Sequence, residues 1–255
     1  MPVHIHPTAD LAPRALLPGD PGRALALAQL VLVEPKMFNH NRGLWGYTGE
    51  AADGEPMTIQ STGMGGPSAA IVLEELCDLG LERAIRVGTC GALHADLALG
   101  DLVVADAALA CDGASRALGA DGLVAADAGL AEALRRAAGD AEMLAGARVH
   151  CGPVATSDLF YEREAGRAAT WRDAGALAVE MEAATLLRVG ELRGIGVACL
   201  LAVSDVFGPD GERRRIDAEE LLRTAERLGR VGAAALAAAS GSGRGRGLGV
   251  RREVP

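Results

Sequence analysis

Short apolar runs alternate along this chain with segments of helical periodicity, and this alternation restricts the possible folds more than any other feature. The apolar runs, rich in aliphatic residues, are residues 15–17, 27–33, 57–62, 84–89, 101–110, 148–157 and 197–205. The segments with helical periodicity are residues 67–80, 128–141, 179–194 and 218–239. Strands that alternate with helices favour a largely parallel or mixed sheet covered on both faces. We therefore predict an α/β fold with a central mixed β-sheet flanked by helices on both faces.

The domain organisation follows from length and composition. A chain of 255 residues lies at the upper end of what one α/β domain occupies. No break in composition divides it before residue 239, so residues 1–239 are predicted to form a single domain. Residues 240–255 are rich in Gly, Ser and Arg and hold too few apolar side chains to fold, so we predict a disordered tail.

The charge balance limits the kind of partner. A net charge of -9 repels polyanions over most of the surface, which argues against nucleic acid. A small anionic substrate would then need a local basic pocket. The N-terminal stretch has no basic region followed by an apolar one, and no run of about 18 uncharged apolar residues occurs. We expect a soluble cytoplasmic protein with no membrane partner.

The cysteines point to the same compartment. The five cysteines are widely spaced and form no CxxC pair, so neither a disulfide framework nor a zinc site is expected. We therefore expect no metal site and a reducing cytoplasm.

Two glycine-containing turns connect a predicted strand to a predicted helix. They are LLPGDPGRA at residues 16–24, which includes Gly19 and Arg23, and STGMGGPSAAIVLEEL at residues 61–76. Such turns expose backbone N–H groups that can bind an anion. The second turn matches neither the dinucleotide fingerprint nor the P-loop, and the chain has scarcely any lysine. A nucleotide cofactor is therefore disfavoured.

Two further arginines have unusual contexts. Arg42 lies in NRGLWGYTGE (41–50), which is typical of a hairpin, and we place the arginine at its tip. Arg86 lies inside the apolar strand IRVGT, where a charge is costly unless an anion or an acid compensates it. The turn after Arg86 places the Thr89 hydroxyl beside that charge, so this segment is the sharper indication of an anion site.

Three carboxylates also stand in apolar surroundings. Glu180 and Glu182 flank Met181, and Asp205 ends an apolar strand, where α/β folds place residues that face a ligand. Buried carboxylates of this kind are catalytic or bind a ligand. A carboxylate at a helix start is also an ordinary partner of the helix dipole, and this second interpretation of Glu180 stays open.

Taken together, these segments resemble the family of hexameric purine nucleoside phosphorylases and uridine phosphorylases. The matching stretches, in order across roughly residues 3–208, are PGDPGRA, RGLWGYTG, GMGGPS, RVGTCGA with its following GD, SDLFY, VEMEA and VSD. The resemblance implies the three-layer nucleoside phosphorylase fold. It also implies phosphorolysis of purine (deoxy)ribonucleosides to the free base and (deoxy)ribose 1-phosphate, with inorganic phosphate as co-substrate and no cofactor.

The resemblance carries over residue by residue. It implies a phosphate site made of Gly19, Arg23, Arg86 and Thr89, with Arg42 supplied by a neighbouring subunit. His4 would contact the 5′-hydroxyl across the same interface, with His6 as the alternative, which implies a homo-oligomer built as a trimer of dimers. The implied nucleoside-binding residues are Met64, Met181 and Glu182 for the ribose and Cys90, Gly91, Phe160, Val179, Glu180 and Ser204 around the base.

Asp205 aligns with the general acid of the family, which protonates N7 of the departing purine with help from an arginine. An aspartate donates a proton at neutral pH only if burial or neighbouring groups keep it protonated. The segment ERRRID offers Arg213, Arg214 and Arg215, and we assign the assisting role to Arg215.

Three rival functions remain to be separated. A uridine phosphorylase uses a Gln-x-Arg after the Phe-Tyr pair, whereas FYEREAGR contains no glutamine. A methylthioadenosine-type nucleosidase attacks with water and has no use for Arg23, Arg42 and Arg86. A nucleoside-binding protein without activity would keep buried charges that cost stability.

Overall fold

The computed structural model describes residues 2–144, 146–164, 166–207 and 212–241. The strands are β1 (Arg14–Leu17), β2 (Leu32–Asn39), β3 (Gly46–Ala51), β4 (Pro56–Gln60), β5 (Arg83–Ala92), β6 (Leu102–Ala110), β7 (Leu123–Ala125), β8 (Val149–Thr156), β9 (Ala178–Glu180), β10 (Gly196–Phe207) and β11 (Arg213–Arg215). The helices are α1 (Pro21–Val31), the 3-10 turn η1 (Asn41–Gly43), α2 (Gly66–Asp78), α3 (Gly113–Ala117), α4 (Ala128–Ala137), α5 (Ala141–Leu144), α6 (Arg167–Asp173), α7 (Ala183–Arg193) and α8 (Ala218–Gly241).

One mixed sheet runs through the molecule, as predicted. Its order is β11-β10-β6-β8-β9-β5-β1-β4-β3-β2, with β7 paired to β6. The parallel strands β4, β1, β5 and β10 form its centre, and β2 and β3 form an antiparallel hairpin at one edge. This hairpin is the one predicted around Arg42, and η1 lies at its tip.

Half of this sheet closes on itself, which the sequence did not indicate. Strand β10 pairs with both β5 and β6, and the pairs β6–β8, β8–β9 and β9–β5 complete a ring of five strands. The carboxyl end of β5 therefore lies between β10 and β9. Residues from three distant parts of the sequence meet there.

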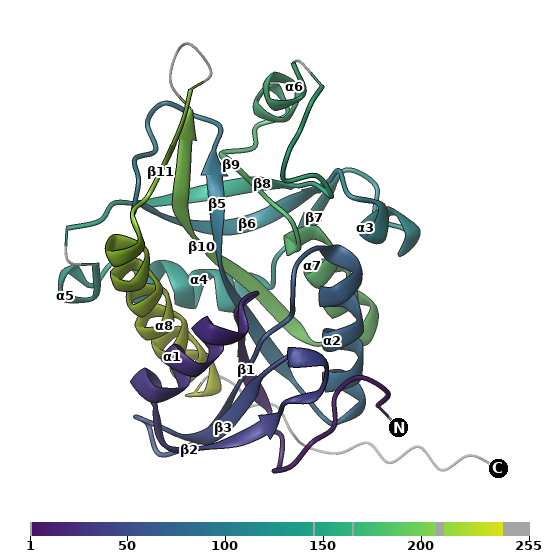
Figure 1. The fold of residues 1–255 in the computed structure, drawn as a ribbon, viewed down its shortest axis with the longest axis vertical. Coiled ribbons are helices and arrows are strands. Elements are labelled where there is room, and N and C mark those ends of the chain that lie inside the picture. Colours follow the sequence, from purple (N-terminus) through teal and green to yellow (C-terminus); the bar gives the residue numbers. More distant parts are fainter. Residues whose placement is uncertain (1, 145, 165, 208–211, 242–255) are drawn as a thin grey trace.

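Two layers of helices cover the sheet. Helices α1, α4 and α8 lie on one side in Figure 1, and α2 and α7 lie on the other. The first layer buries Leu27, Leu134 and Leu228 in one core cluster. The second buries Leu73, Leu76 and Leu186 in another. Both clusters consist mainly of aliphatic side chains.

Three segment predictions were wrong. The turn predicted after Arg86 does not form, because β5 continues as one strand from Arg83 to Ala92. Residues 27–31, predicted as part of a strand, are the last turns of α1, and β2 begins only at Leu32. Ala24, Leu27 and Ala28 are buried at helical spacing, which the apolar run obscured. Residues 179–180, predicted as helical, belong to β9, because Val179 pairs with the end of β5 and Glu180 pairs with β8.

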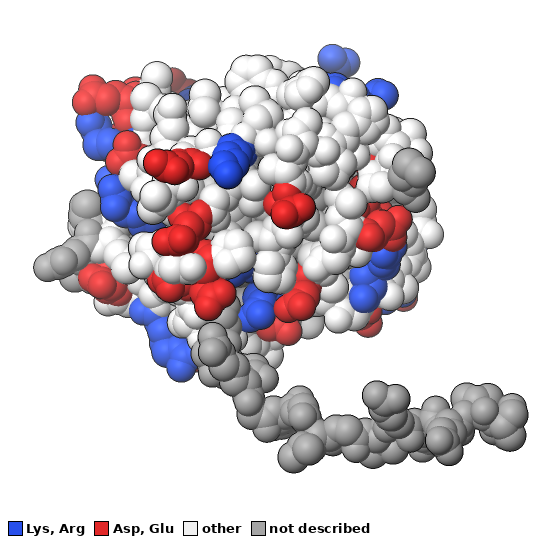
Figure 2. All heavy atoms as spheres, turned by 90° about the horizontal axis from the view of Figure 1, so that it is seen from below, with Lys and Arg blue, Asp and Glu red and all other residues white. Residues whose placement is uncertain are grey.

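The distribution of charged side chains on the surface fits a protein with a net negative charge. Figure 2 shows acidic and basic side chains interspersed on the face it views, without a continuous basic stripe. Across the described residues, no helix is long and apolar enough to span a bilayer, and no group of three His, Cys, Asp or Glu side chains could hold a metal ion. Of the predicted tail, residues 242–255 lie outside the described part of the chain.

Candidate active site

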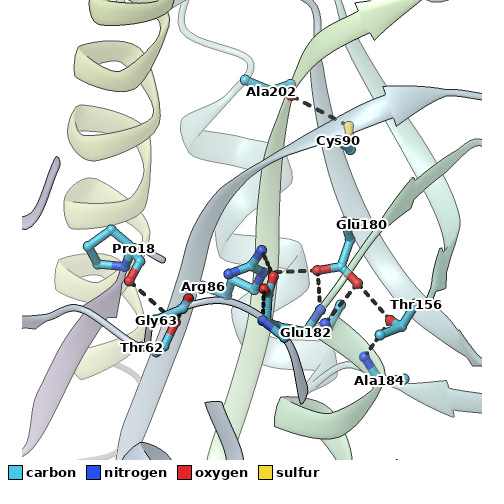
Figure 3. Close-up of polar contacts among 12 residues, drawn as sticks. Pro18, Thr62, Gly63, Arg86, Cys90, Thr156, Glu180, Glu182, Ala184 and Ala202 are labelled. Atoms are coloured by element: carbon cyan, nitrogen blue, oxygen red, sulfur yellow. Dashed lines mark hydrogen bonds and ion pairs between the residues drawn. The ribbon is translucent and has the colours of Figure 1, made fainter. Parts of the chain in front are cut away.

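A buried arginine forms the centre of the candidate site. Arg86 lies on the central strand β5 and is 4% exposed. Its Nε donates to Oε2 of Glu180 over 3.1 Å, and its Nη2 pairs with Oε2 of Glu182. Figure 3 shows both carboxylates turned toward this guanidinium. Burial lowers the pKa of Arg86, but the charges of Glu182 and Glu180 outweigh it and the pKa rises, so the guanidinium stays charged.

One donor atom of this guanidinium has no partner in the described part of the chain. The Nη1 atom of Arg86 is buried and makes no hydrogen bond to any described residue. An unsatisfied buried donor on a charged group is costly, and it is therefore the atom from which a bound anion would gain most. The buried arginine that the sequence predicted as part of an anion site thus has an open donor.

Gly88, two residues after Arg86, explains how the guanidinium fits. A Cβ atom at Gly88 would lie 2.8 Å from Nη2 and 2.9 Å from Cζ of Arg86. The side chain of Arg86 folds over this position, so only a residue without a side chain leaves it room. Gly88 therefore belongs to the site although it contributes no functional group.

Glu180 holds Arg86 in place and is fully engaged. Its Oε1 accepts from the Thr156 hydroxyl at 2.6 Å and from the amide of Ala183 at 2.8 Å. Its Oε2 accepts from Arg86 and, at 2.9 Å, from the amide of Glu182. Burial raises the pKa of Glu180, and the Arg86 charge opposes that rise. Glu180 thus acts as a partner of the start of α7, as the second interpretation expects, and it also holds Arg86. A ligand-binding role for Glu180 stays a prediction.

The two glycine turns lie against each other beside Arg86. The amide of Thr62 donates to the carbonyl of Pro18 at 2.9 Å, and the amide of Gly63 donates to that of Gly19 at 3.0 Å. Figure 3 shows this contact next to the guanidinium. The second turn also reaches the carboxylates, since the Gly65 amide donates to Glu182 Oε1 at 2.6 Å.

Arg23 follows the first turn, as predicted. It lies in the first turn of α1, whose N-cap Asp20 accepts from the Arg23 amide at 2.7 Å. Burial lowers the pKa of Arg23; Asp20 opposes this shift, and the charge of Arg86 adds to it. Two guanidinium groups that repel each other favour an anion between them.

Asp205 lies near the carboxyl end of β10, where it pairs with Gly91 of β5. The pairing of β10 with β5 shifts register between Val203 and Asp205, so Ser204 is an extra residue. This bulge lets two neighbouring side chains meet, and the Ser204 hydroxyl lies 2.7 Å from Asp205 Oδ2. The same hydroxyl lies 3.3 Å from the carbonyl oxygen of Cys90.

Two arginines of β11 contact the other oxygen of Asp205. Arg213 Nε donates to Oδ1 at 2.7 Å, and Arg215 Nη1 lies 3.3 Å from the same atom. Both arginines also lie over Phe160, whose ring centre is 4.3 Å from Cζ of Arg213 and 6.0 Å from Cζ of Arg215. The arginine assigned from the sequence is Arg215, but the shorter contact belongs to Arg213.

The other predicted base-pocket residues lie near Asp205. Gly91 pairs with Val179 on β9 and with Asp205 on β10. A Cβ at Gly91 would lie 3.6 Å from Val179 and 3.5 Å from Phe207, so the glycine leaves open space between these side chains. Cys90 is buried with its thiol 3.5 Å from the Ala202 carbonyl oxygen, and burial raises the pKa of the thiol. Cys90 therefore contributes a neutral wall.

Three predicted residues lie at the site without a hydrogen bond from their side chains to a described residue. Thr89 is half-buried on β5 opposite Ala202, and Met181 is half-buried between the two glutamates. Met64, in the second glycine turn, is 85% exposed. An apolar side chain so exposed beside a polar cluster is available to cover a ligand.

His4 and Arg42 lie apart from this cluster. Across the described part of the chain, no hydrogen bond or ion pair joins either side chain to Arg86, Glu182 or Asp205. Arg42 is exposed at the hairpin tip with a left-handed backbone, φ 57°. His4 contacts Glu75 on α2 instead. Arg42 is therefore on the surface, whereas the His4 ring is half-buried against α2.

Comparison with known proteins agrees with the sequence motifs. Residues 13–239 match the model of the Phosphorylase superfamily. A protein of Exiguobacterium sp. named purine nucleoside phosphorylase DeoD-type is 35% identical over 231 residues, covering 88% of this chain and 96% of the relative. A protein of the same name from Caldanaerobacter subterraneus is 36% identical over 80% of this chain and 88% of its own. A guanosine phosphorylase of Halorubrum lacusprofundi is 37% identical over 76% and 78%. This chain, with its buried arginine between two glycine turns and its aspartate at the strand end, therefore belongs to the Phosphorylase superfamily.

Proposed function

We propose that this protein catalyses the phosphorolysis of purine (deoxy)ribonucleosides in purine salvage, with phosphate as co-substrate and without a cofactor. The observation that carries the proposal is the buried Arg86, whose Nη1 atom has no hydrogen-bond partner among the described residues. It lies close to Arg23 and between two glycine turns. The names of three relatives, two purine nucleoside phosphorylases and a guanosine phosphorylase, support the substrate class.

The phosphate dianion would occupy the space beside Arg23 and Arg86. The amide-lined turn at Gly19 and the Thr89 hydroxyl complete this half of the site. Fixed donors in a desolvated pocket orient the nucleophile without reorganisation, which removes much of the entropic barrier. In the reaction a phosphate oxygen forms a bond to C1′ as the bond between C1′ and N9 of the purine breaks.

The ribose would lie between phosphate and base. Glu182 lies beside Arg86, and its carboxylate can accept hydrogen bonds from sugar hydroxyls. Met64 and Met181 would cover the apolar face of the sugar. As the glycosidic bond breaks, the ribosyl group becomes cationic, and the adjacent phosphate and Glu182 stabilise that charge.

The base would lie against Phe160 and beside Gly91, Val179 and Ser204, with Asp205 at its N7 atom. The leaving purine gains a proton on N7, and Asp205 supplies it. Arg213 donates to Oδ1 of Asp205, so we expect the bound base to displace this arginine before Asp205 can face N7. Arg213 also covers the ring of Phe160, so a base that stacks there would displace it.

The complete enzyme would be a cytoplasmic transferase that works as a homo-oligomer. His4 and Arg42 of one subunit would complete the site of its neighbour, in a trimer of dimers. Arg42 is exposed, the His4 side chain is 29% exposed, and neither is joined to Arg86 among the described residues, which supports this assignment. Its partners are small molecules only, a nucleoside and phosphate.

A substrate panel tests the proposal. Inosine, guanosine, adenosine and uridine are each incubated with the purified protein, with and without inorganic phosphate. We expect purine release that depends on phosphate and yields a pentose 1-phosphate. Preferential cleavage of uridine would favour a uridine phosphorylase, and base release without phosphate would favour a nucleosidase. Absence of cleavage for every nucleoside would leave only a binding protein.

A further inference from the structure

The N-terminal segment is fastened to α2 by a single carboxylate. Glu75 accepts from the amides of Val3 at 3.0 Å, His4 at 2.8 Å and Ile5 at 2.7 Å. It also contacts Nδ1 of the His4 ring at 2.7 Å. These contacts lower the pKa of Glu75 to about 2 although burial raises it, so the carboxylate is ionised at neutral pH. Ile5, fully buried beside it, anchors the segment in the core.

This contact determines which nitrogen of His4 carries the proton. An ionised carboxylate only accepts hydrogen bonds, so Nδ1 of His4 must donate to it. In a neutral ring the other nitrogen, Nε2, then carries the lone pair and can accept a hydrogen bond. The ring is 29% exposed, so this acceptor can be reached from outside the subunit.

The same segment is tied to the hairpin tip. The Asn41 side-chain amide donates to the carbonyl oxygen of His4 at 2.9 Å, and Arg42 is the next residue. Asn39 accepts from the amides of His6 at 2.9 Å and Asn41 at 3.3 Å. His4 and Arg42 are thereby held on one surface of the subunit before any partner binds.

We propose that Glu75 is a positioning residue, which fixes His4 as a hydrogen-bond acceptor for nucleosides that carry a free 5′-hydroxyl. This inference rests on the proposed function, in which His4 reaches the nucleoside of a neighbouring subunit. Glu75 itself would touch neither substrate nor reacting atoms. Its contribution is to order a segment near the chain terminus, so that little conformational entropy is lost when the 5′-hydroxyl binds.

The variant Glu75→Gln tests this role. A glutamine offers one oxygen and one NH₂ group, and the NH₂ group must face either the His4 ring or the Ile5 amide. If the NH₂ group faces the ring, Nδ1 of His4 must accept and the proton moves to Nε2. If it faces the Ile5 amide, the hydrogen bond that holds the segment is lost. We expect KM for inosine to rise roughly 3- to 10-fold with little change in kcat, the loss typical of one hydrogen bond. For 5′-deoxyinosine, which lacks the hydroxyl, KM should be unchanged.

A matched control lies one residue earlier on the same helix. Glu74 pairs with Arg193 at 2.6 Å on an exposed face and has no contact with the N-terminal segment among the described residues. Glu74→Gln should leave KM for both substrates at the wild-type value. An equal rise with Glu74→Gln would mean that loss of charge on α2, and not the His4 contact, causes the effect.

A double-mutant cycle shows whether Glu75 acts through His4. If it does, adding Glu75→Gln to His4→Ala should raise KM for inosine no further. Additive effects, or a wild-type preference for inosine over 5′-deoxyinosine that survives in Glu75→Gln, would overturn the inference and leave the proposed function intact.

If the wild-type enzyme cleaves both substrates with equal KM, the role of His4 itself is wrong. If it cleaves neither, the proposed function fails first.

Discussion

At the scale of single residues, the site depends on a missing side chain as much as on those present. The guanidinium of Arg86 occupies the volume that a Cβ at position 88 would need. Because the end of an arginine side chain is flexible, a methyl group there would move the guanidinium without unfolding the strand. A substitution at Gly88 therefore moves the Arg86 guanidinium while the arginine itself is kept.

We predict that Gly88→Ala raises KM for phosphate at least roughly tenfold, since Arg86 loses its place beside Glu182, an interaction of a kind worth about 1.5–3 kcal/mol. Steady-state kinetics at varied phosphate concentration measure this effect. Gly129→Ala, in the first turn of α4 and away from the site, is the control and should behave as wild type. An unchanged KM for phosphate in Gly88→Ala would mean that Arg86 does not bind this anion.

A second prediction concerns Asp205. Replacing it with alanine should lower kcat for purine nucleosides roughly 10²- to 10⁴-fold, the usual contribution of a general acid, with a much smaller change in KM. Asp173→Ala, at the exposed end of α6, is the control. Turnover that survives Asp205→Ala would remove this residue from the mechanism.

The sequence alone identified some residues of the candidate site and missed others. Arg86, Glu182 and Asp205 were found because a charge in an apolar strand, or at its end, needs a compensating partner. Thr156, Gly88 and Arg213 were not identified in this way. A threonine or a glycine in a strand needs no such partner, and the sequence does not distinguish Arg213 from the two neighbouring arginines. Their roles depend on which strands become neighbours, and only the three-dimensional structure shows this.

At the scale of helices and strands, α8 fixes the site by packing close to the sheet. A Cβ at Gly232 would lie 2.9 Å from Leu16 and 3.2 Å from Val87, which belong to β1 and β5. These strands lead into the first glycine turn and toward Arg86. Close contact at this glycine therefore places the long helix against the strands that carry the candidate site.

We predict that Gly232→Val lowers the free energy of unfolding by about 1–3 kcal/mol, because a branched side chain overpacks this contact. The thermal midpoint, compared at one protein concentration, measures the change. Arg230→Val, on the exposed face of the same helix, is the matched control and should shift the midpoint little. Equal midpoints for the two variants would show that the helix does not need this close contact.

Helix and strand predictions failed where the apolar pattern was short. Residues 27–33 contain leucines and valines that suit either a strand or a buried helix face, and periodicity cannot separate the two over so few residues. Longer segments such as α2 and α8 were predicted well, since their periodicity extends over several turns. The short strands β7, β9 and β11 carry no pattern of their own and form because a neighbouring strand offers an edge.

At the scale of the whole molecule, the fold class was predictable but the closed ring of five strands was not. The alternation of strands and helices reports only local conformation. Ring closure depends on β10 pairing with two strands that lie about a hundred residues earlier, and local sequence carries no record of such distant pairs.

Assembly yields the last prediction. If Arg42 acts in the neighbouring site, chains with Arg42→Ala and chains with Asp205→Ala should complement each other in mixed assemblies. With random pairing, half of the pairs are mixed and one of their two sites is intact, so about a quarter of wild-type activity should return. Co-expression of differently tagged chains and assay of the doubly purified fraction measure it. Activity no higher than that of either variant alone would place Arg42 outside the partner's site.

The extra residue at Ser204 has a consequence for how this strand can change. Along an extended chain, odd and even positions point to opposite sides, so one added or lost residue exchanges the two sets. Deleting Ser204 would restore regular alternation with β5 and alter which residues face the base. The number of residues in β10 therefore matters as much as their identity. Deleting Ser204 removes no carboxylate, yet we expect it to reduce activity as much as replacing Asp205 does.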